Sequence, residues 1–303
     1  MIFDAIIIGG SFAGLSAAIQ LARGRRSVCV IDAGQPRNRF ASHSHGFFAH
    51  DGDAPRVLIG AGREKVAAYP NVTFIDAQAT GTRGQNEDFT VTAGGQDIQG
   101  RKLILAFGIR DNLPDMRGLK ERWGHSVLHC PYCHGYEFQG QPLGVLSLTP
   151  MSAHQALMIP EWGPTTFFLN GGEMPDSQTR ARLQQRHVII EPARISGFVG
   201  AAPDMAGVML EDGRTVPITA LYLGSRTELN SPIAGVLGCA LQDGMFGPVI
   251  QIDGMGQTSV PGVYAAGDIA RSAHNATWAT SDGVMAGSAA HRSLIFDPLG
   301  MTF

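Results

Sequence analysis

The sequence predicts an α/β protein in which parallel strands are covered by helices. Two observations lead to this class. Short apolar strands alternate with Ala-rich helices along the chain, and strands near both ends run into glycine turns, "DAIIIGG" and "VPGVYAAGD". Such alternation is typical of parallel sheets, because a helix usually returns the chain between two parallel strands. At 303 residues the chain is long enough for two domains.

The composition excludes several functional classes. The chain is 44% hydrophobic and 16% charged, with a formal net charge of −3, and it has no basic excess that would attract nucleic acid or an anionic membrane. No segment approaches the roughly 20 apolar residues of a membrane span. The start, "MIFDAIIIGG", lacks the basic region of a signal peptide. We therefore expect a cytoplasmic protein.

The first element is a strand, a glycine turn and a helix, "DAIIIGGSFAGLSAAIQLAR", followed by a second strand, "SVCVID". This is the dinucleotide fingerprint: glycines allow a tight turn, phosphate lies at the helix N-terminus, and an acid about 20 residues on reaches a ribose hydroxyl. Ser11 replaces the middle glycine, where its side chain crowds the pyrophosphate slightly but offers a hydroxyl donor. The predicted contacts are Gly9, Ser11, Phe12, Ala13, Gly14 and Asp32.

A second cofactor signal lies near the C-terminus. "VPGVYAAGD" is an apolar strand closed by Gly267 and Asp268, and a helix rich in small residues follows it. The stretch resembles the C-terminal flavin motif of flavoproteins with two dinucleotide-binding domains. That resemblance implies FAD as the cofactor, with Asp268 on the ribityl chain and the helix N-terminus at the flavin pyrimidine. The residues implied are Gly267, Asp268, Asn275, Ala276 and Thr277, with a helix N-cap role as the alternative for Asn275. "LILAFG", which ends at Gly108, resembles the strand at which such proteins leave the flavin domain.

The most informative stretch is "CPYCHGYE", which begins at Cys130. A Cys-x-x-Cys pair can be a dithiol redox centre or half of a zinc site, and with a following His it also spells the c-type haem attachment motif. The other two cysteines, Cys29 and Cys239, stand in apolar runs and are expected to be buried. They do not form a second close pair.

Together these motifs resemble the low-molecular-weight thioredoxin reductases over essentially the whole chain. The resemblance favours a redox role for Cys130 and Cys133, with no metal, since haem attachment needs an exported cytochrome. It implies two Rossmann-like domains: a FAD domain of residues 1–113 plus 245–303, and an inserted domain of residues 114–244 that carries the pair. It further implies a homodimer, with Cys133 toward the flavin and Cys130 toward a small dithiol or disulfide, or a thioredoxin-like protein.

The residue after the pair departs from that family. Thioredoxin reductases carry an Asp there, whereas this chain has His134. An imidazole, with an ordinary pKa of about 6.5, can take and return a thiol proton near neutral pH. "CxxCHG" resembles the FAD-dependent dithiol oxidases that close disulfides in gliotoxin and holomycin. His134 is the first candidate base and His129 the second. Asn38 and His45, after the second strand, are candidate cofactor contacts.

The inserted domain departs as well. Its turn holds Ser147, Leu148, Thr149 and Pro150 where NADPH-binding relatives have glycines. Side chains there fill the space for a pyrophosphate, and proline removes a donor. "NGGEMPD", which starts at Asn170, replaces the basic cluster for the 2′-phosphate. We therefore do not expect NADPH to bind in the usual way.

The leading hypothesis is a FAD-dependent dithiol oxidase that passes electrons from a substrate dithiol through Cys130 and Cys133 to flavin, with oxygen as acceptor. The first alternative is a disulfide reductase of the thioredoxin reductase type, supplied by NADPH or by an unusual donor such as ferredoxin. The second is a flavoprotein that senses redox state without catalysis.

Overall fold

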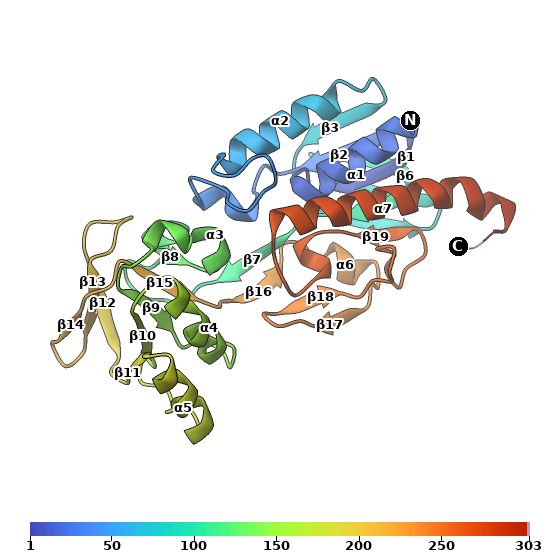
Figure 1. Ribbon diagram of the computed structural model, residues 1–303. Helices are drawn as coiled ribbons and strands as arrows, with labels where there is room; N and C mark the ends of the chain where they lie inside the picture. Colours follow the sequence, from blue (N-terminus) through green and yellow to red (C-terminus); the bar gives the residue numbers. More distant parts are fainter. Residues whose placement is uncertain (302–303) are drawn as a thin grey trace. The chain divides into compact units, whose positions relative to one another are not determined.

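The chain forms two compact units in the computed structural model, which describes residues 1–301 (Figure 1). The discontinuous unit comprises residues 1–39, 55–110 and those from 227 onward, and the inserted unit comprises residues 40–54 and 111–226. The expected return to the first domain near residue 245 is therefore too late. Residues 227–244 belong to the discontinuous unit because Ile233, Ala234 and Cys239 pack into its apolar core. The assignment of residues 40–54 to the inserted unit was not expected.

One mixed sheet organises the discontinuous unit, in the order β3-β2-β1-β6-β5-β4, with β19 also paired to β6. Strands β1, β2, β3, β6 and β19 run parallel, while β4 and β5 form an antiparallel extension. The strand bounds are β1 Ile2–Ile8, β2 Val28–Asp32, β3 Val72–Asp76, β4 Ala79–Gln85, β5 Asp88–Ala93, β6 Gln96–Leu105 and β19 Val263–Ala265. The carboxyl ends of β1 and β2 thus carry the glycine turn and Asp32 at the same edge.

Three long helices accompany this sheet: α1 (Phe12–Arg23), α2 (Pro55–Ala67) and α7 (Ala276–Phe296). Helices α1 and α7 pack closely because small residues line their contact: a Cβ added to Gly283 would lie 2.0 Å from the Ala13 carbonyl oxygen. The remaining elements are α6 (Ile233–Val236), β17 (Leu241–Asp243), β18 (Pro248–Ile250) and the 3₁₀ turns Arg37–Phe40, Asp268–Ala270 and Asp297–Leu299. Among the helices of residues 1–301, none is long and apolar enough to cross a membrane.

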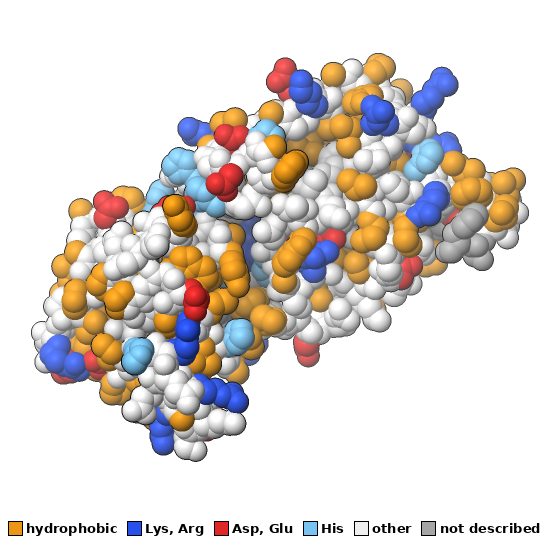
Figure 2. Space-filling view, viewed as in Figure 1, with side chains coloured by type: hydrophobic (Ala, Val, Ile, Leu, Met, Phe, Trp, Pro, Cys, Tyr) orange, Lys and Arg blue, Asp and Glu red, His pale blue; other side chains and the backbone are white. Residues whose placement is uncertain are grey.

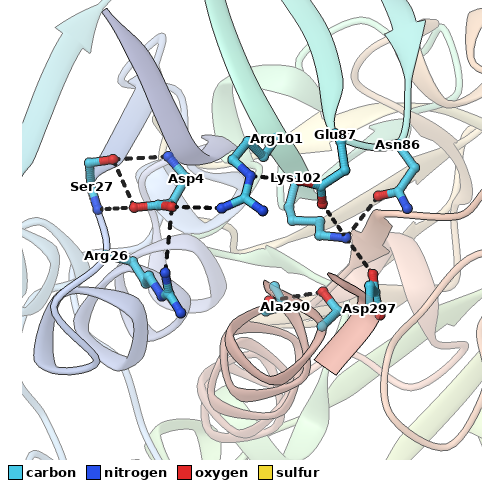
Figure 3. Close-up of polar contacts among 10 residues, drawn as sticks. Asp4, Arg26, Ser27, Asn86, Glu87, Arg101, Lys102, Ala290 and Asp297 are labelled. Carbon is cyan, nitrogen blue, oxygen red and sulfur yellow. Dashed lines mark hydrogen bonds and ion pairs between the residues drawn. The ribbon is translucent and has the colours of Figure 1, made fainter. Parts of the chain in front are cut away.

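A buried cation interrupts the apolar core. The side chain of Lys102, on β6, is fully buried. Its Nζ lies 2.8 Å from Asn86 Oδ1, 2.9 Å from Glu87 Oε1 and 2.6 Å from Asp297 Oδ2 (Figure 3). Buried charges need such partners, because desolvation otherwise makes them unstable. The network links β6 to the turn that follows α7.

The inserted unit is built on a parallel sheet with the order β11-β10-β9-β15-β8. Its strands are β8 Val127–Leu128, β9 Leu143–Leu146, β10 Thr165–Phe168, β11 Ile189–Glu191 and β15 Ala220–Leu223. Its helices are α3 Pro131–His134, α4 Ser152–Met158 and α5 Ser177–Gln185, with 3₁₀ turns Lys120–Arg122, Tyr136–Phe138 and Ile159–Glu161. Strands β12 (Ile195–Val199), β13 (Gly207–Leu210) and β14 (Thr215–Val216) form an antiparallel sheet.

The chain crosses between the units on two strands, β7 (Ile109–Asn112) and β16 (Arg226–Leu229), which pair as a two-stranded sheet. Each unit has helices on a sheet in which neighbouring strands run parallel, wholly in one unit and in part in the other, so the predicted α/β class with two Rossmann-like sheets is confirmed.

Candidate functional site

The two cysteines of "CPYC" lie on one short turn of the inserted unit. Cys130 is the extended N-cap residue of α3, with φ −113° and ψ 117°, and Pro131 is the first helical residue. A proline favours this geometry, because it pushes the preceding residue to extended angles and suits the first helical position. The sulfur atoms of Cys133 and Cys130 are 2.9 Å apart. The turn therefore holds two partly exposed thiols within reach of each other.

His134 ends α3, and its carbonyl oxygen accepts a hydrogen bond of 3.0 Å from the buried Tyr222 hydroxyl. Burial of the ring lowers the pKa of His134 below its ordinary value, and the neighbouring His45, His125 and His43 lower it further. The Glu137 carboxylate opposes this shift. The imidazole is therefore mainly neutral at neutral pH, the form that accepts a thiol proton.

The second candidate base, His129, precedes the pair. Its Nδ1 lies 3.4 Å from the Leu223 carbonyl oxygen, and its own carbonyl accepts a 2.8 Å hydrogen bond from Gln155. These contacts attach the start of the dithiol turn to the end of β15 and to helix α4. The geometry accounts for a structural contribution of His129, and its expected role as a base is untested.

His45 was expected to contact the cofactor, and the structure brings it to the dithiol turn. Its Nε2 is 3.2 Å from Glu137 Oε1, and its ring meets the His134 ring edge-on with centroids 6.2 Å apart. All three residues belong to the inserted unit. Figure 2 shows histidine side chains gathered beside acidic ones on one face of the molecule.

The glycine turn after β1 has the geometry of a phosphate-binding turn. Gly9 has φ +109°, and a Cβ there would lie 2.2 Å from the Ala106 carbonyl oxygen. A Cβ on Gly14 would lie 1.8 Å from the Gly9 oxygen, and one on Gly10 would lie 2.9 Å from Asp32 Cβ. Only glycine fits these positions. The turn thus opens onto the N-terminus of α1 with the Asp32 carboxylate beside it, and these residues fit a dinucleotide.

The remaining residues of this turn lead into the helix. Ser11 is the N-cap of α1, although within the described chain its side chain makes no capping hydrogen bond. Phe12 and Ala13 form the first helical positions. Their amides are at the positive end of the helix dipole, which favours an anionic phosphate.

The C-terminal motif forms a second polar cluster in the same unit. Gly267 has φ +83°, and its amide donates to Asp282 Oδ2 at 3.3 Å. Asp282 also accepts from Arg271 Nε at 2.7 Å. Arg37 Nη1 donates to Asp268 Oδ2 at 3.2 Å. Arg37, Arg271 and Asp282 were not predicted: Arg37 lies 231 residues from Asp268, and no motif marks the pairing of Arg271 with Asp282.

The other expected cofactor residues occupy turns of the same unit. Asn275 caps α7, its Oδ1 accepting from the Thr277 amide at 2.8 Å, and Ala276 begins the helix. Gly108 has φ +69°, and its carbonyl accepts from the Asn230 amide at 3.1 Å. Asn38 lies next to Arg37 in a 3₁₀ turn. Their contacts to a flavin remain expectations.

The inserted unit's own nucleotide-like turn, between β9 and α4, is closed by a side chain. Ser152 Oγ accepts from the Leu148 amide at 3.0 Å and the Thr149 amide at 3.1 Å. In a nucleotide-binding turn such amides face phosphate. The sequence did not reveal one cation of this unit: the exposed Arg194 packs against Gly171, after β10.

The other two cysteines are buried, as expected. Burial raises the pKa of the Cys29 thiol to about 11 and also raises that of Cys239. Such thiols are poor nucleophiles. Across the described part of the chain, no group of three or more His, Cys, Asp or Glu side chains is placed to hold a metal ion.

Known proteins resemble this chain along nearly its full length. Residues 3–155 match the family model described as pyridine nucleotide-disulphide oxidoreductase. The chain is 35% identical to thioredoxin reductase sirT of Leptosphaeria maculans, over 95% of this chain and 93% of that protein. It is 34% identical to thioredoxin reductase tcpT of Claviceps purpurea, over 98% and 95%.

Two crystal structures share the fold. An oxidoreductase from Agrobacterium tumefaciens superposes with a TM-score of 0.93 at 45% identity, covering 98% of this chain and 99% of that one. The protein HlmI superposes with a TM-score of 0.90 at 34% identity, covering 99% and 94%.

Proposed function

Because the chain belongs to the pyridine nucleotide-disulphide oxidoreductase family, among its thioredoxin reductase-like members, we propose that it is a FAD-dependent dithiol oxidase. Members of this group are FAD-binding flavoproteins that exchange electrons between dithiols and disulfides. The finer proposal is that this chain takes electrons from a small substrate dithiol, does not use NADPH, and has oxygen as its final acceptor. The main support for independence from NADPH is the closed turn between β9 and α4, where the Leu148 and Thr149 amides donate hydrogen bonds to Ser152 Oγ.

In the proposed reaction Cys130 meets the substrate and Cys133 faces the flavin, as the resemblance to thioredoxin reductases implies. In the disulfide form, a substrate thiolate attacks Cys130, breaks the bond between the two protein sulfurs and releases the Cys133 thiolate. The second substrate thiol then attacks the substrate sulfur of the mixed disulfide and releases Cys130. The substrate loses two electrons and two protons, and the protein pair gains them. Bound FAD supplies the two-electron acceptor that returns the pair to its disulfide form.

His134 handles the protons in this proposal. Only the thiolate attacks, so each substrate thiol must lose its proton first. The neutral imidazole next to Cys133 accepts that proton and returns it to a departing protein thiolate, so the two half-reactions balance.

The cofactor would be held by the discontinuous unit. The glycine turn after β1 and Asp32 would take the adenosine and pyrophosphate end, and Asp268 with the start of α7 would take the ribityl and flavin end. Arg37, 3.2 Å from Asp268, would add a positive charge that partly balances the negative charges of Asp32, Asp268 and the cofactor phosphates.

The test compares two reductants of the holoenzyme under nitrogen, and the absorbance of the flavin at about 450 nm measures its reduction. We expect dithiothreitol to bleach the flavin, NADPH to leave it oxidised, and air to restore the colour rapidly after dithiol reduction. Fast bleaching by NADPH would contradict the proposal. Bleaching by dithiol without turnover in air would favour a donor-driven reductase or a redox sensor.

One observation favours a second function, a disulfide reductase that uses NADPH. Arg194 lies against Gly171, just beyond β10, where a cation can meet a 2′-phosphate. The same bleaching experiment separates the two functions, and Arg194→Ala should matter only if NADPH is the donor.

A further inference from the structure

The loop of residues 40–54, here called the histidine loop, brings an imidazole and a carboxylate together beside His134. His45 Nε2 is 3.2 Å from Glu137 Oε1, and His45 presents its ring edge-on to His134. The other nitrogen of His45 is 3.6 Å from Asp51 Oδ1. His45 thus lies between two carboxylates, those of Asp51 and Glu137, and Glu137 is on the turn that follows the dithiol pair.

Packing against the inserted unit and hydrogen bonds within the loop hold the histidine loop in place. A Cβ on Gly124 would lie 3.0 Å from the Phe40 carbonyl oxygen, so the start of the loop is seated directly on the backbone of the inserted unit. The loop closes on itself through bonds from the Ser44 amide to the Asp53 carbonyl, 2.8 Å, and from the Gly46 amide to Asp51 Oδ1, 2.8 Å. These contacts fix the backbone on both sides of His45.

The charges that face His134 come from three segments. Glu137, on the turn after α3, favours the imidazolium form, whereas His45 and His43 of the histidine loop and His125 before β8 disfavour it. Glu137 and His45 act in opposite directions and contact each other. When His45 is neutral, the carboxylate favours proton uptake by His134, and when His45 is protonated it offsets the carboxylate and favours release.

We propose that His45 and Glu137 are positioning residues that together set the protonation state of His134 beside the dithiol. The inference rests on the proposed function in one respect, that His134 serves the dithiol. The pair acts through His134 and has no assigned contact with substrate.

The chain offers a matched control. His50 and Asp53 form another histidine–carboxylate pair in the same loop, 2.9 Å apart and about half exposed, and they do not figure among the groups acting on His134. Glu137→Gln and His45→Asn are therefore compared with Asp53→Asn and His50→Asn. Glu137→Gln and Asp53→Asn preserve side-chain size, the two His→Asn changes shorten the side chain equally, and bound flavin and circular dichroism verify folding.

The experiment is a pH titration of the oxidised holoenzyme labelled with ¹³C at histidine Cε1, with His134→Asn used to assign the His134 signal. We expect Glu137→Gln to move the His134 midpoint to lower pH and His45→Asn to move it to higher pH, each by on the order of half a unit. The two controls should leave it unchanged. A purely structural role would not give opposite shifts. Shifts in the same direction, or none, would overturn the proposal.

This titration involves no substrate, so it is independent of the proposed function. The pH dependence of flavin bleaching by dithiothreitol is measured in the same variants. If the NMR midpoints move as expected while the bleaching profile stays fixed, the assignment of His45 and Glu137 stands and His134 is not the base of the reaction. If the midpoints do not move, the assignment fails whatever the bleaching shows.

Discussion

A single imidazole determines how the dithiol loses its protons in the proposed reaction. His134→Asn removes the base and leaves a neutral polar side chain, so we expect dithiol-driven flavin bleaching at neutral pH to slow by about 100-fold, with FAD still bound. Because burial lowers the pKa of His134, the wild-type rate should stay high somewhat below pH 6.5 and fall only as the imidazole becomes protonated. Stopped-flow bleaching across pH tests both points, and an unchanged rate would remove His134 from the mechanism.

A second prediction for a single residue concerns Arg37 and the retention of FAD. Its ion pair with Asp268 is partly buried, with both side chains about one-fifth exposed, so removing the cation leaves an unneutralised carboxylate in the proposed cofactor site. We expect Arg37→Ala to weaken FAD retention by about tenfold, measured as flavin released during gel filtration and by fluorescence titration. Arg39→Ala, two residues on, is the control. Equal retention in both variants would exclude an electrostatic role for Arg37.

Local sequence patterns predict some secondary-structure elements but not the contacts between distant ones. The β1–α1–β2 unit was predicted because its glycines and Asp32 lie within one short run whose spacing is itself the signal. The contact between Arg37 and Asp268 joins positions 231 residues apart, and no local pattern reports it. The same reason explains the wrong boundary near residue 245, because the packing of Ile233 and Cys239 in the first core depends on the whole sheet.

Lys102 illustrates the same limit and leads to a stability prediction. It stands in an apolar strand, yet it is buried with Glu87 and Asp297 as partners. Asp297→Asn removes one partner of this buried cation, and we expect a loss of about 1–3 kcal/mol in the free energy of unfolding. Asp97→Asn, which breaks an exposed pair with Arg83, should cost clearly less, because water screens exposed ion pairs. Urea unfolding of both variants gives the comparison.

The same cluster should respond to acid. Burial alone would raise the pKa of Glu87, but hydrogen bonds from Lys102 and Arg101 outweigh it and hold that pKa below its ordinary value. A lowered folded-state pKa stabilises the protein above the unfolded-state pKa, and this stability is lost as pH falls through the folded-state value. Glu87→Gln should therefore reduce the acid-induced part of the stability loss below about pH 4.5. If the free energy of unfolding of the variant falls with acid as steeply as that of the unmodified protein, Glu87 does not contribute to the acid sensitivity.

The whole molecule divides its ligand-binding features between two units, and hydrogen exchange can observe both at once. The glycine turn, Asp32 and Asp268 lie in the discontinuous unit, so FAD should slow amide exchange at the start of α1 and in the turn after β19. In the inserted unit, the amides of Leu148 and Thr149 are already bonded to Ser152. Millimolar NADPH added to the holoenzyme should therefore leave exchange in peptides covering residues 147–152 unchanged. Protection of those peptides together with the segment around Arg194 would show that the closed turn opens for a nucleotide, and would favour NADPH over a dithiol as the electron donor.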